Sequence, residues 1–292
     1  MSEVLYFLHI PKTGGTTLSA YLDQNFAPLQ ILTDKLWKTL IQKNPPAELD
    51  DQIKLIRGHF GISIYNFYPK TNFQIITMLR DPVSRVVSMY NHLLNDEIYW
   101  CQQLEPDSRP TIEELLQKPR FIQSFSNAST RHLSIKIQQR DKLKELKQYE
   151  NYSYEFDPLF QKTEQEVKDL YALAIRQLDN SLFVGIQEFY NESLQLLAYK
   201  LNWQPIRNSL RLMSLPQALK HSELKPQTRS IIQELNQSDQ KLYDFALRKF
   251  QIEYDLMKED LYDHYFEQSW NGKPKNEQVY QMLLQRSKNG VR

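Results

Sequence analysis

The chain has 292 residues, and its 36 lysines and arginines nearly balance its 35 aspartates and glutamates, for a formal net charge of +1 at pH 7. This balance excludes a protein that binds nucleic acid through its overall charge, so we expect no nucleic-acid partner. A hydrophobic content of 41% excludes a disordered chain, and a single cysteine, Cys101, excludes both an intramolecular disulfide framework and a zinc site built from several cysteines.

The first predicted element is a buried strand over residues 4–10, and a glycine turn and an amphipathic helix over residues 16–26 follow it directly. The apolar stretch of this strand is too short for a membrane span and lacks the features of a signal peptide. No later stretch approaches the roughly 18 uninterrupted apolar residues of a membrane helix. We therefore expect no membrane span and a cytoplasmic location.

The glycine turn, in the string HIPKTGGTTL, has the composition of an anion-binding loop. Gly14 and Gly15 allow a positive φ and a close approach of the backbone to a ligand. The N–H groups that open the next helix can hold an anion at the positive end of the helix dipole. Lys12 precedes both glycines, whereas a Walker A loop places its lysine after the second glycine, which disfavours an ordinary P-loop kinase or GTPase. Hydroxyl donors around the glycines are supplied by Thr13, Thr16 and Thr17.

Further strands are predicted over residues 54–57, 73–79 and 182–186. Strands that alternate with helices after a strand–loop–helix phosphate site indicate an α/β fold, with a P-loop-like, mainly parallel sheet flanked by helices. Since repeats and Gly/Ser linkers are missing from the sequence, residues 1–292 are expected to form a single domain; whether residues 251–292 dock on it stays open. The helix-rich C-terminal half is predicted from patterns over residues 112–117, 164–178, 193–201 and 226–250.

The string LRDPVSRVVSMY predicts the end of a strand followed by the start of a helix. Asp81 is suited to cap that helix, and Pro82 to occupy its first position. Arg80 is expected at the carboxyl end of a central strand, where open α/β sheets bind ligands, with Ser88 about two helical turns further on. An arginine fork and a serine hydroxyl are suited to a second phosphate.

Together these two strings resemble the signature segments of the carbohydrate sulfotransferases, in particular the group related to heparan sulfate 2-O- and 6-O-sulfotransferases. A softer similarity extends over residues 183–203, and residues 251–292 do not align. The resemblance implies an O-sulfotransferase that uses 3′-phosphoadenosine 5′-phosphosulfate (PAPS), releases 3′-phosphoadenosine 5′-phosphate (PAP), and acts on a hydroxyl of a carbohydrate or of a small molecule. We expect no metal cofactor, because the sequence shows no obvious cluster of metal ligands.

The resemblance also implies roles for individual residues. Arg80 and Ser88 would grip the 3′-phosphate. Lys12 is suited to the charge that builds on the bridging oxygen during sulfuryl transfer. His59, in the string IRGHFG, is the expected general base, because a histidine between the two signatures is the proposed base in the family. The 5′-phosphosulfate would be held by Pro11, Lys12, Thr13, Gly14, Gly15, Thr16 and Thr17.

Other residues carry weaker predictions. His9 is expected to be a structural hydrogen-bonding residue, and His92 is the second choice for the base. The string NASTRHL places Arg131 and His132 where they could reach an anionic acceptor. A basic run over residues 136–147 could line an acceptor groove, although most such runs are solvated helix faces. Candidates for a loop that closes over the nucleotide are Arg207, Asn208 and Arg211.

Two alternative functions stay open at this point. One is a kinase with a variant phosphate loop, which would require Mg²⁺ and ATP. The other is a non-catalytic protein that binds nucleotide and sugar. The sequence chooses neither the acceptor nor the oligomeric state.

Overall fold

The computed structural model of the chain describes residues 3–33, 48–94, 110–118, 121–122, 125–134, 164–206, 219–265 and 276–289. Its centre is a sheet of five strands, all paired in parallel, in the order β2-β3-β1-β4-β5. The predicted α/β fold with a parallel sheet is thereby confirmed. The strands are β1 (Val4–Leu8), β2 (Ile31–Thr33), β3 (Leu55–Gly58), β4 (Phe73–Leu79) and β5 (Phe183–Ile186).

This strand order places β1 between β3 and β4. The register pairs Leu8 with Gly58 on one side and with Thr77 on the other, so the three strands end close together. Because the carboxyl ends of parallel strands meet at one edge, the connections that follow β1, β3 and β4 are neighbours. The edge strand β2 was not predicted, since three residues are too few to show a period.

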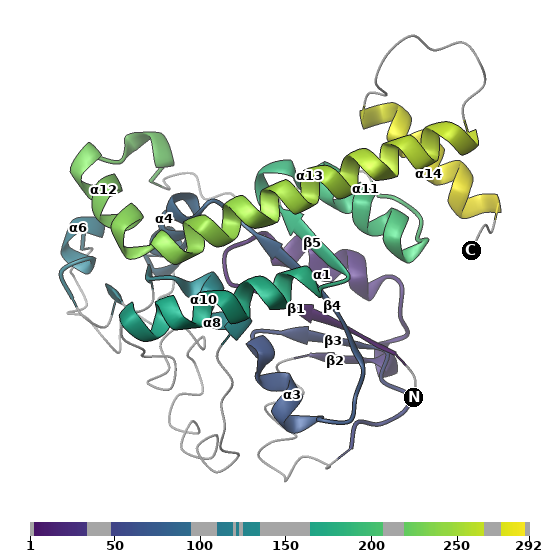
Figure 1. Ribbon diagram of the computed structural model, residues 1–292, viewed down its shortest axis with the longest axis horizontal. Coiled ribbons are helices and arrows are strands. Elements are labelled where there is room, and N and C mark those ends of the chain that lie inside the picture. Colours follow the sequence, from purple (N-terminus) through teal and green to yellow (C-terminus); the bar gives the residue numbers. More distant parts are fainter. Residues whose placement is uncertain are drawn as a thin grey trace.

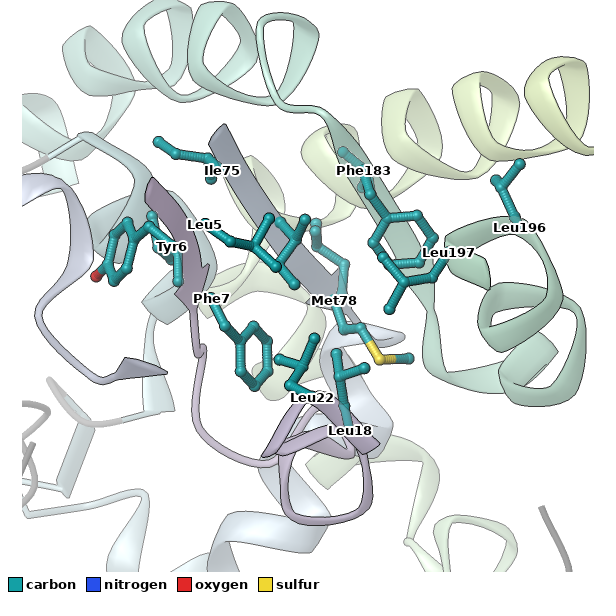
Figure 2. Packing of buried hydrophobic residues seen from close by; sticks show 14 of the residues in the cluster. Leu5, Tyr6, Phe7, Leu18, Leu22, Ile75, Met78, Phe183, Leu196 and Leu197 are labelled. Carbon is teal, nitrogen blue, oxygen red and sulfur yellow. The ribbon is translucent and has the colours of Figure 1, made fainter. Parts of the chain in front are cut away.

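The sheet is buried on both faces. Successive residues of β1 face opposite sides, as the period of a strand requires. Tyr6 packs against Phe60 and Phe73, with ring centroids 6.5 and 5.8 Å away. Phe7 lies on the side of Leu18 and Leu22, which come from the first helix (Figure 2).

The helices lie around this sheet, and the longest of them, α13 (Gln237–Tyr265), packs along β5 and several helices (Figure 1). A second, smaller hydrophobic cluster is built by α4 (Pro82–Leu94), α6 (Ile112–Leu115) and α12 (Pro226–Leu235). The remaining α-helices are α1 (Gly15–Asp23), α3 (Ile64–Phe67), α8 (Ala128–Ser134), α10 (Glu164–Asp179), α11 (Tyr190–Leu201) and α14 (Asn276–Asn289). Short 3-10 turns are η1 (Pro28–Gln30), η2 (Gly61–Ser63), η6 (Gln187–Phe189) and η7 (His221–Glu223).

The single helical stretch predicted over residues 226–250 is wrong, because the chain breaks at Asn236 between α12 and α13. The break is stabilised by a reciprocal pair of caps between distant segments. Asn127 Oδ1 accepts hydrogen bonds from the N–H groups of Ser238 and Asp239, at 3.0 and 3.1 Å. Asp239 in turn accepts from the N–H groups of Ser129 and Thr130, at 2.9 and 2.7 Å. Each helix start thus supplies the cap of the other.

The described part of residues 251–292 docks on the rest of the chain. Helix α14 packs on α11 and α13 (Figure 1). Its Val279, Met282 and Leu283 are buried in the main hydrophobic cluster. Polar contacts reinforce the docking, since Tyr199 of α11 donates to Asp260 of α13 at 2.6 Å. No helix among the described residues has both the length and the apolar character that crossing a membrane requires.

Candidate functional site

The β1–α1 loop is the centre of the candidate site. Lys12 and Gly14 both adopt the left-handed conformation, with φ of 68° and 89°. Gly14 is the N-cap of α1, and no side chain among the described residues caps this helix. The first turn of α1 also lacks an acidic residue. The first turn of α1 therefore supplies no carboxylate of its own to neutralise the positive end of the helix dipole, which suits an anion site.

The two glycines of this loop are also required by their neighbours. A Cβ on Gly14 would lie 2.8 Å from Cε2 of Tyr190, in addition to the strain of its positive φ. A Cβ on Gly15 would collide with the His9 ring. The loop thus lies directly on His9 and Tyr190, and no side chain larger than hydrogen fits at either position without a shift of these rings.

The structure corrects one role predicted for the threonines. Thr13 is fully buried, and its hydroxyl donates to the Ile10 carbonyl at 2.8 Å. Since a hydroxyl has one proton to donate, this one stabilises the loop and is unavailable to an anion. Thr16 is exposed, so its hydroxyl stays a candidate, whereas the half-buried Thr17 hydrogen-bonds to the Tyr190 hydroxyl. Pro11 is buried next to them.

His59 lies at the end of β3, beside the β1–α1 loop. Its Nδ1 is 2.8 Å from the His9 carbonyl, and its ring centroid is 4.3 Å from that of His9. Because a carbonyl oxygen only accepts, Nδ1 must carry the proton in this contact. Neutral His59 then has its lone pair on Nε2, the nitrogen that can take a proton from a hydroxyl.

Two further histidines lie behind His59. His9 is half-buried, and desolvation together with the nearby His59 lowers its pKa well below the usual value. His132 of α8 is 2% exposed, and burial lowers its pKa to about 3. Its Nδ1 donates to the Ala128 carbonyl at 2.8 Å. Both rings are therefore neutral near pH 7, and the structural hydrogen-bonding role of the His9 side chain stays a prediction.

Arg80 connects the two predicted phosphate segments. It follows β4, and its Nη1 donates to the Lys12 carbonyl at 3.3 Å. Its Nε is buried and finds no hydrogen-bond acceptor among the described residues. Burial lowers the pKa of the Arg80 guanidinium, while the nearby carboxylates of Glu188 and Asp81 raise it. A buried guanidinium N–H without an acceptor is costly, so this position fits an anionic ligand.

The start of α4 agrees with the pattern predicted for it. Asp81 Oδ1 accepts from the Ser84 N–H at 2.7 Å, and Pro82 is the first helical residue. Ser88 lies one turn beyond Ser84 on the same face and is half-buried. Arg85, by contrast, is fully buried and donates to the Phe125 carbonyl at 3.0 Å. The two arginines of this string therefore have different surroundings.

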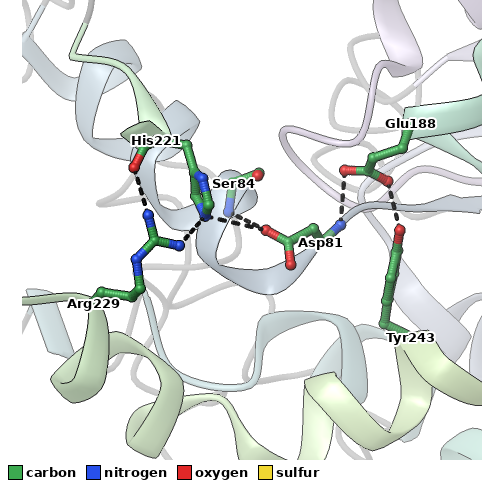
Figure 3. A network of polar contacts seen from close by, with 6 residues as sticks. All are labelled: Asp81, Ser84, Glu188, His221, Arg229 and Tyr243. Carbon is green, nitrogen blue, oxygen red and sulfur yellow. Dashed lines mark hydrogen bonds and ion pairs between the residues drawn. The ribbon is translucent and has the colours of Figure 1, made fainter. Parts of the chain in front are cut away.

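A polar network flanks the start of α4 (Figure 3). One carboxylate oxygen of Glu188 accepts from the Asp81 N–H at 3.1 Å, and the other accepts from the Tyr243 hydroxyl at 3.0 Å. Arg229 donates through Nη1 to His221 Nε2 at 2.8 Å. That nitrogen therefore carries no proton here, and its 4.0 Å separation from Asp81 Oδ1 is not a hydrogen bond.

Other predicted residues lie away from this edge or in the interior. Arg131 and His132 are 5% and 2% exposed, so their side chains do not present a surface to an acceptor, and their role in binding stays a prediction. His92 is exposed on α4, about 15 Å along the helix axis from its start. The following predictions lie outside the described residues: Cys101, the basic run at 136–147, Arg207, Asn208 and Arg211.

Two residues of the site were missed from the sequence. Glu188 and Tyr190 follow β5 and reach the two predicted phosphate segments, at Asp81 and Gly14 respectively. The string QEFY carries no spacing that distinguishes it from an ordinary helix start. Its position after a strand was the available signal, because that places it at the same edge of the sheet.

Comparison with known proteins places this site in a family. A profile of the sulfotransferase family matches residues 2–246, which include Lys12, His59 and Arg80. The chain belongs to the sulfotransferase family. The predicted family is thereby confirmed, and the kinase alternative loses support.

The relatives with which this sulfotransferase-family chain aligns share a quarter of its residues. It is 25% identical to heparan-sulfate 6-O-sulfotransferase 3-B of Danio rerio, over 88% of the chain and 66% of the relative. It is 27% identical to heparan-sulfate 6-O-sulfotransferase 2 of Gallus gallus, over 88% of the chain and 69% of the relative. For heparan-sulfate 6-O-sulfotransferase 1-A of Danio rerio the identity is 27%, over 84% of the chain and 64% of the relative. The chain therefore spans about two thirds of the length of these relatives.

Proposed function

We propose that this protein is a PAPS-dependent O-sulfotransferase whose acceptor is a hydroxyl of a carbohydrate. The observation that carries the proposal is the position of Arg80. Its guanidinium holds the backbone of Lys12 and has a buried N–H without a described acceptor, beside a helix start without a side-chain cap. A nucleotide with phosphates at its 3′ and 5′ positions matches these two neighbouring anion sites.

Roles for the chain's own residues follow from this arrangement. The N–H groups at the start of α1 would hold the 5′-phosphosulfate, and Arg80 with Ser88 the 3′-phosphate. When bound, PAPS supplies an activated sulfuryl group, whose transfer to a hydroxyl leaves PAP. Lys12 would neutralise the charge that develops on the leaving phosphate oxygen, and His59 Nε2 would accept the proton of the acceptor hydroxyl.

The carbohydrate acceptor is supported by the names of the relatives, all of which are heparan-sulfate 6-O-sulfotransferases. We propose a uronic-acid polysaccharide of that type as the first acceptor to test. Incubation with PAPS and N-sulfated heparosan, followed by disaccharide analysis, should show added sulfate. Sulfation of a small hydroxyl compound with none on polysaccharide would contradict this choice of acceptor while leaving the reaction class intact.

The cofactor is tested by calorimetric titration with PAP, ADP and ATP, each with and without Mg²⁺. We expect micromolar, metal-independent binding of PAP that exceeds the binding of ADP and ATP. Arg80→Ala should weaken PAP binding by about 10- to 100-fold, because it removes a charge-assisted pair. Arg176→Ala, at an exposed arginine of α10, is the matched control and should bind as the wild type does. Preference for ATP that depends on Mg²⁺ would overturn the proposal.

A further inference from the structure

Tyr190 joins the β1–α1 loop from a distant part of the chain. It is the first residue of α11, and its hydroxyl donates to the Gly14 carbonyl at 2.9 Å. The Thr17 side chain hydrogen-bonds to the same hydroxyl, and the Tyr190 ring lies against the Cα of Gly14. One side chain thus contacts both the N-cap residue and the first turn of α1.

The bond to Gly14 has a consequence for the next peptide N–H. In a planar trans peptide the C=O and the following N–H point in opposite directions. Tyr190 holds the Gly14 carbonyl on its own side, so the Gly15 N–H must point away from Tyr190. Gly15 is the first residue of α1, and its N–H is one of the donors that a helix cannot satisfy internally.

Arg80 acts on the same loop in the same way. Its Nη1 holds the Lys12 carbonyl, and the Thr13 N–H must therefore point away from Arg80. Two alternate carbonyls of the loop, at Lys12 and Gly14, are held from outside by side chains that follow β4 and β5. Lys12 and Gly14 both have a positive φ, which is a feature of loops whose successive N–H groups face one concave, anion-binding side.

We propose that Tyr190 is a positioning residue for the 5′-phosphosulfate: its hydroxyl holds the Gly14 carbonyl and so aims the Gly15 N–H at the anion. This inference rests on the proposed function, which assigns the 5′-phosphosulfate to this loop. Tyr190 itself need not touch the ligand. Its effect should therefore be confined to ligands that carry a 5′ anion, which a general loss of stability would not reproduce.

The test compares PAP, which has both phosphates, with 3′-AMP, which lacks the 5′-phosphate. The dissociation constant of 3′-AMP divided by that of PAP measures the contribution of the 5′-phosphate to binding in the wild type. In Tyr190→Phe this ratio should fall about five- to twentyfold, while the affinity for 3′-AMP stays unchanged. The matched control is Tyr199→Phe on the same helix, which removes a hydroxyl bonded to Asp260 at 2.6 Å, and it should leave the ratio at the wild-type value.

A second measurement covers the case in which Tyr190→Phe binds poorly for structural reasons. Amide hydrogen exchange in the free protein should rise in a peptide over residues 12–18 and stay unchanged in one over residues 73–79. An unchanged ratio would overturn the inference. Where Tyr190→Phe binds too weakly for the ratio to be measured, unchanged exchange over residues 12–18 would overturn it. Failure of the wild type to bind PAP would instead overturn the proposed function.

Discussion

The two strand-to-helix connections of the site start their helices in opposite ways. At α4 the protein satisfies the helix itself, because the Asp81 carboxylate accepts from the Ser84 N–H at 2.7 Å. At α1 the N-cap is Gly14 in the left-handed conformation, and no described side chain caps the helix. A helix start that the protein caps is part of the fold, whereas one left without a cap can hold a ligand anion.

The same difference separates two arginines only five positions apart. Arg85 is fully buried, and its Nη2 donates to the Phe125 carbonyl. Arg80 is half-buried and holds the loop backbone at Lys12. One arginine therefore stabilises the packing of α4, and the other faces the region proposed for the nucleotide. A short motif thus contains both structural and ligand-binding chemistry.

The largest expected effect concerns His59, which lies beside the uncapped β1–α1 connection. His59→Asn should lower kcat by about 10²- to 10⁴-fold, because it removes the proposed general base. His264→Asn is a matched control, since His264 Nδ1 makes the same 2.8 Å contact with a backbone carbonyl on an exposed helix. Steady-state assays with PAPS should show wild-type activity for the control. Full activity of His59→Asn would remove this residue from the mechanism.

The second effect is a dependence of the free energy of unfolding on pH, caused by the neutral histidines His9 and His132. Burial lowers the pKa of His132 to about 3 and that of His9 well below its usual value. In the unfolded chain both take up a proton near pH 6.5, so the unfolded state binds more protons below that pH. The free energy of unfolding should therefore be at its full value above pH 6.5 and fall toward pH 3, by up to about 1.4 kcal/mol per pH unit for each histidine.

Urea unfolding at pH 7, 6 and 5 measures this slope. His132→Asn keeps a side-chain donor for the Ala128 carbonyl and removes the titrating ring, so the slope should become shallower. A slope identical to that of the wild type would show that His132 is already protonated in the folded state.

The third effect tests the glycine at the uncapped helix start. Gly14→Ala should lower the free energy of unfolding by about 1–2 kcal/mol, because an alanine at φ of 89° is strained. The added Cβ would also lie 2.8 Å from the Tyr190 ring, so PAP affinity should fall as well. Thermal unfolding with and without PAP reports both changes. Unchanged stability would contradict the left-handed conformation at this position.

The fourth effect tests the capped helix start. Asp81→Ala should cost about 1 kcal/mol of stability, the usual loss when an N-cap acceptor is removed. Asp81→Ser restores an acceptor for the Ser84 N–H, and most of the loss should be recovered. Urea midpoints for the two variants would decide this; equal destabilisation by both would mean that Asp81 acts by its charge and not as a cap.

The smallest expected change in stability comes from a substitution that should stabilise the fold and weaken PAP binding. Thr16 is exposed in the first turn of α1, and Thr16→Asp would place there the negative charge that this turn lacks. We expect stability to rise by about 0.3–1 kcal/mol through the helix dipole, and PAP affinity to fall. Differential scanning calorimetry and PAP titration measure the two. A gain in PAP affinity would contradict an anion site at this helix start.

The sequence predicted those parts of the site that depend on neighbours along the chain. The left-handed Gly14, the Asp81 cap and the position of Arg80 at the end of β4 each follow from a few consecutive residues. It misjudged the Thr13 hydroxyl, because burial directs that group to Ile10 and the local pattern does not show burial. The strand β2 was missed because three residues are too few to show a period, and the break at Asn236 was missed because Asn127, which caps the next helix, lies more than 100 positions away.

By itself, then, the sequence determined the family, the parallel α/β architecture and the two segments that a phosphate-bearing ligand would meet. Only the tertiary structure decided which distant side chains complete them. Tyr190 reaches Gly14 across 176 positions of the chain, and Glu188 reaches Asp81 across 107. Helix caps and strand ends are encoded by spacings of a few residues, but contacts between strand ends depend on the order of strands in the sheet, which no local spacing records.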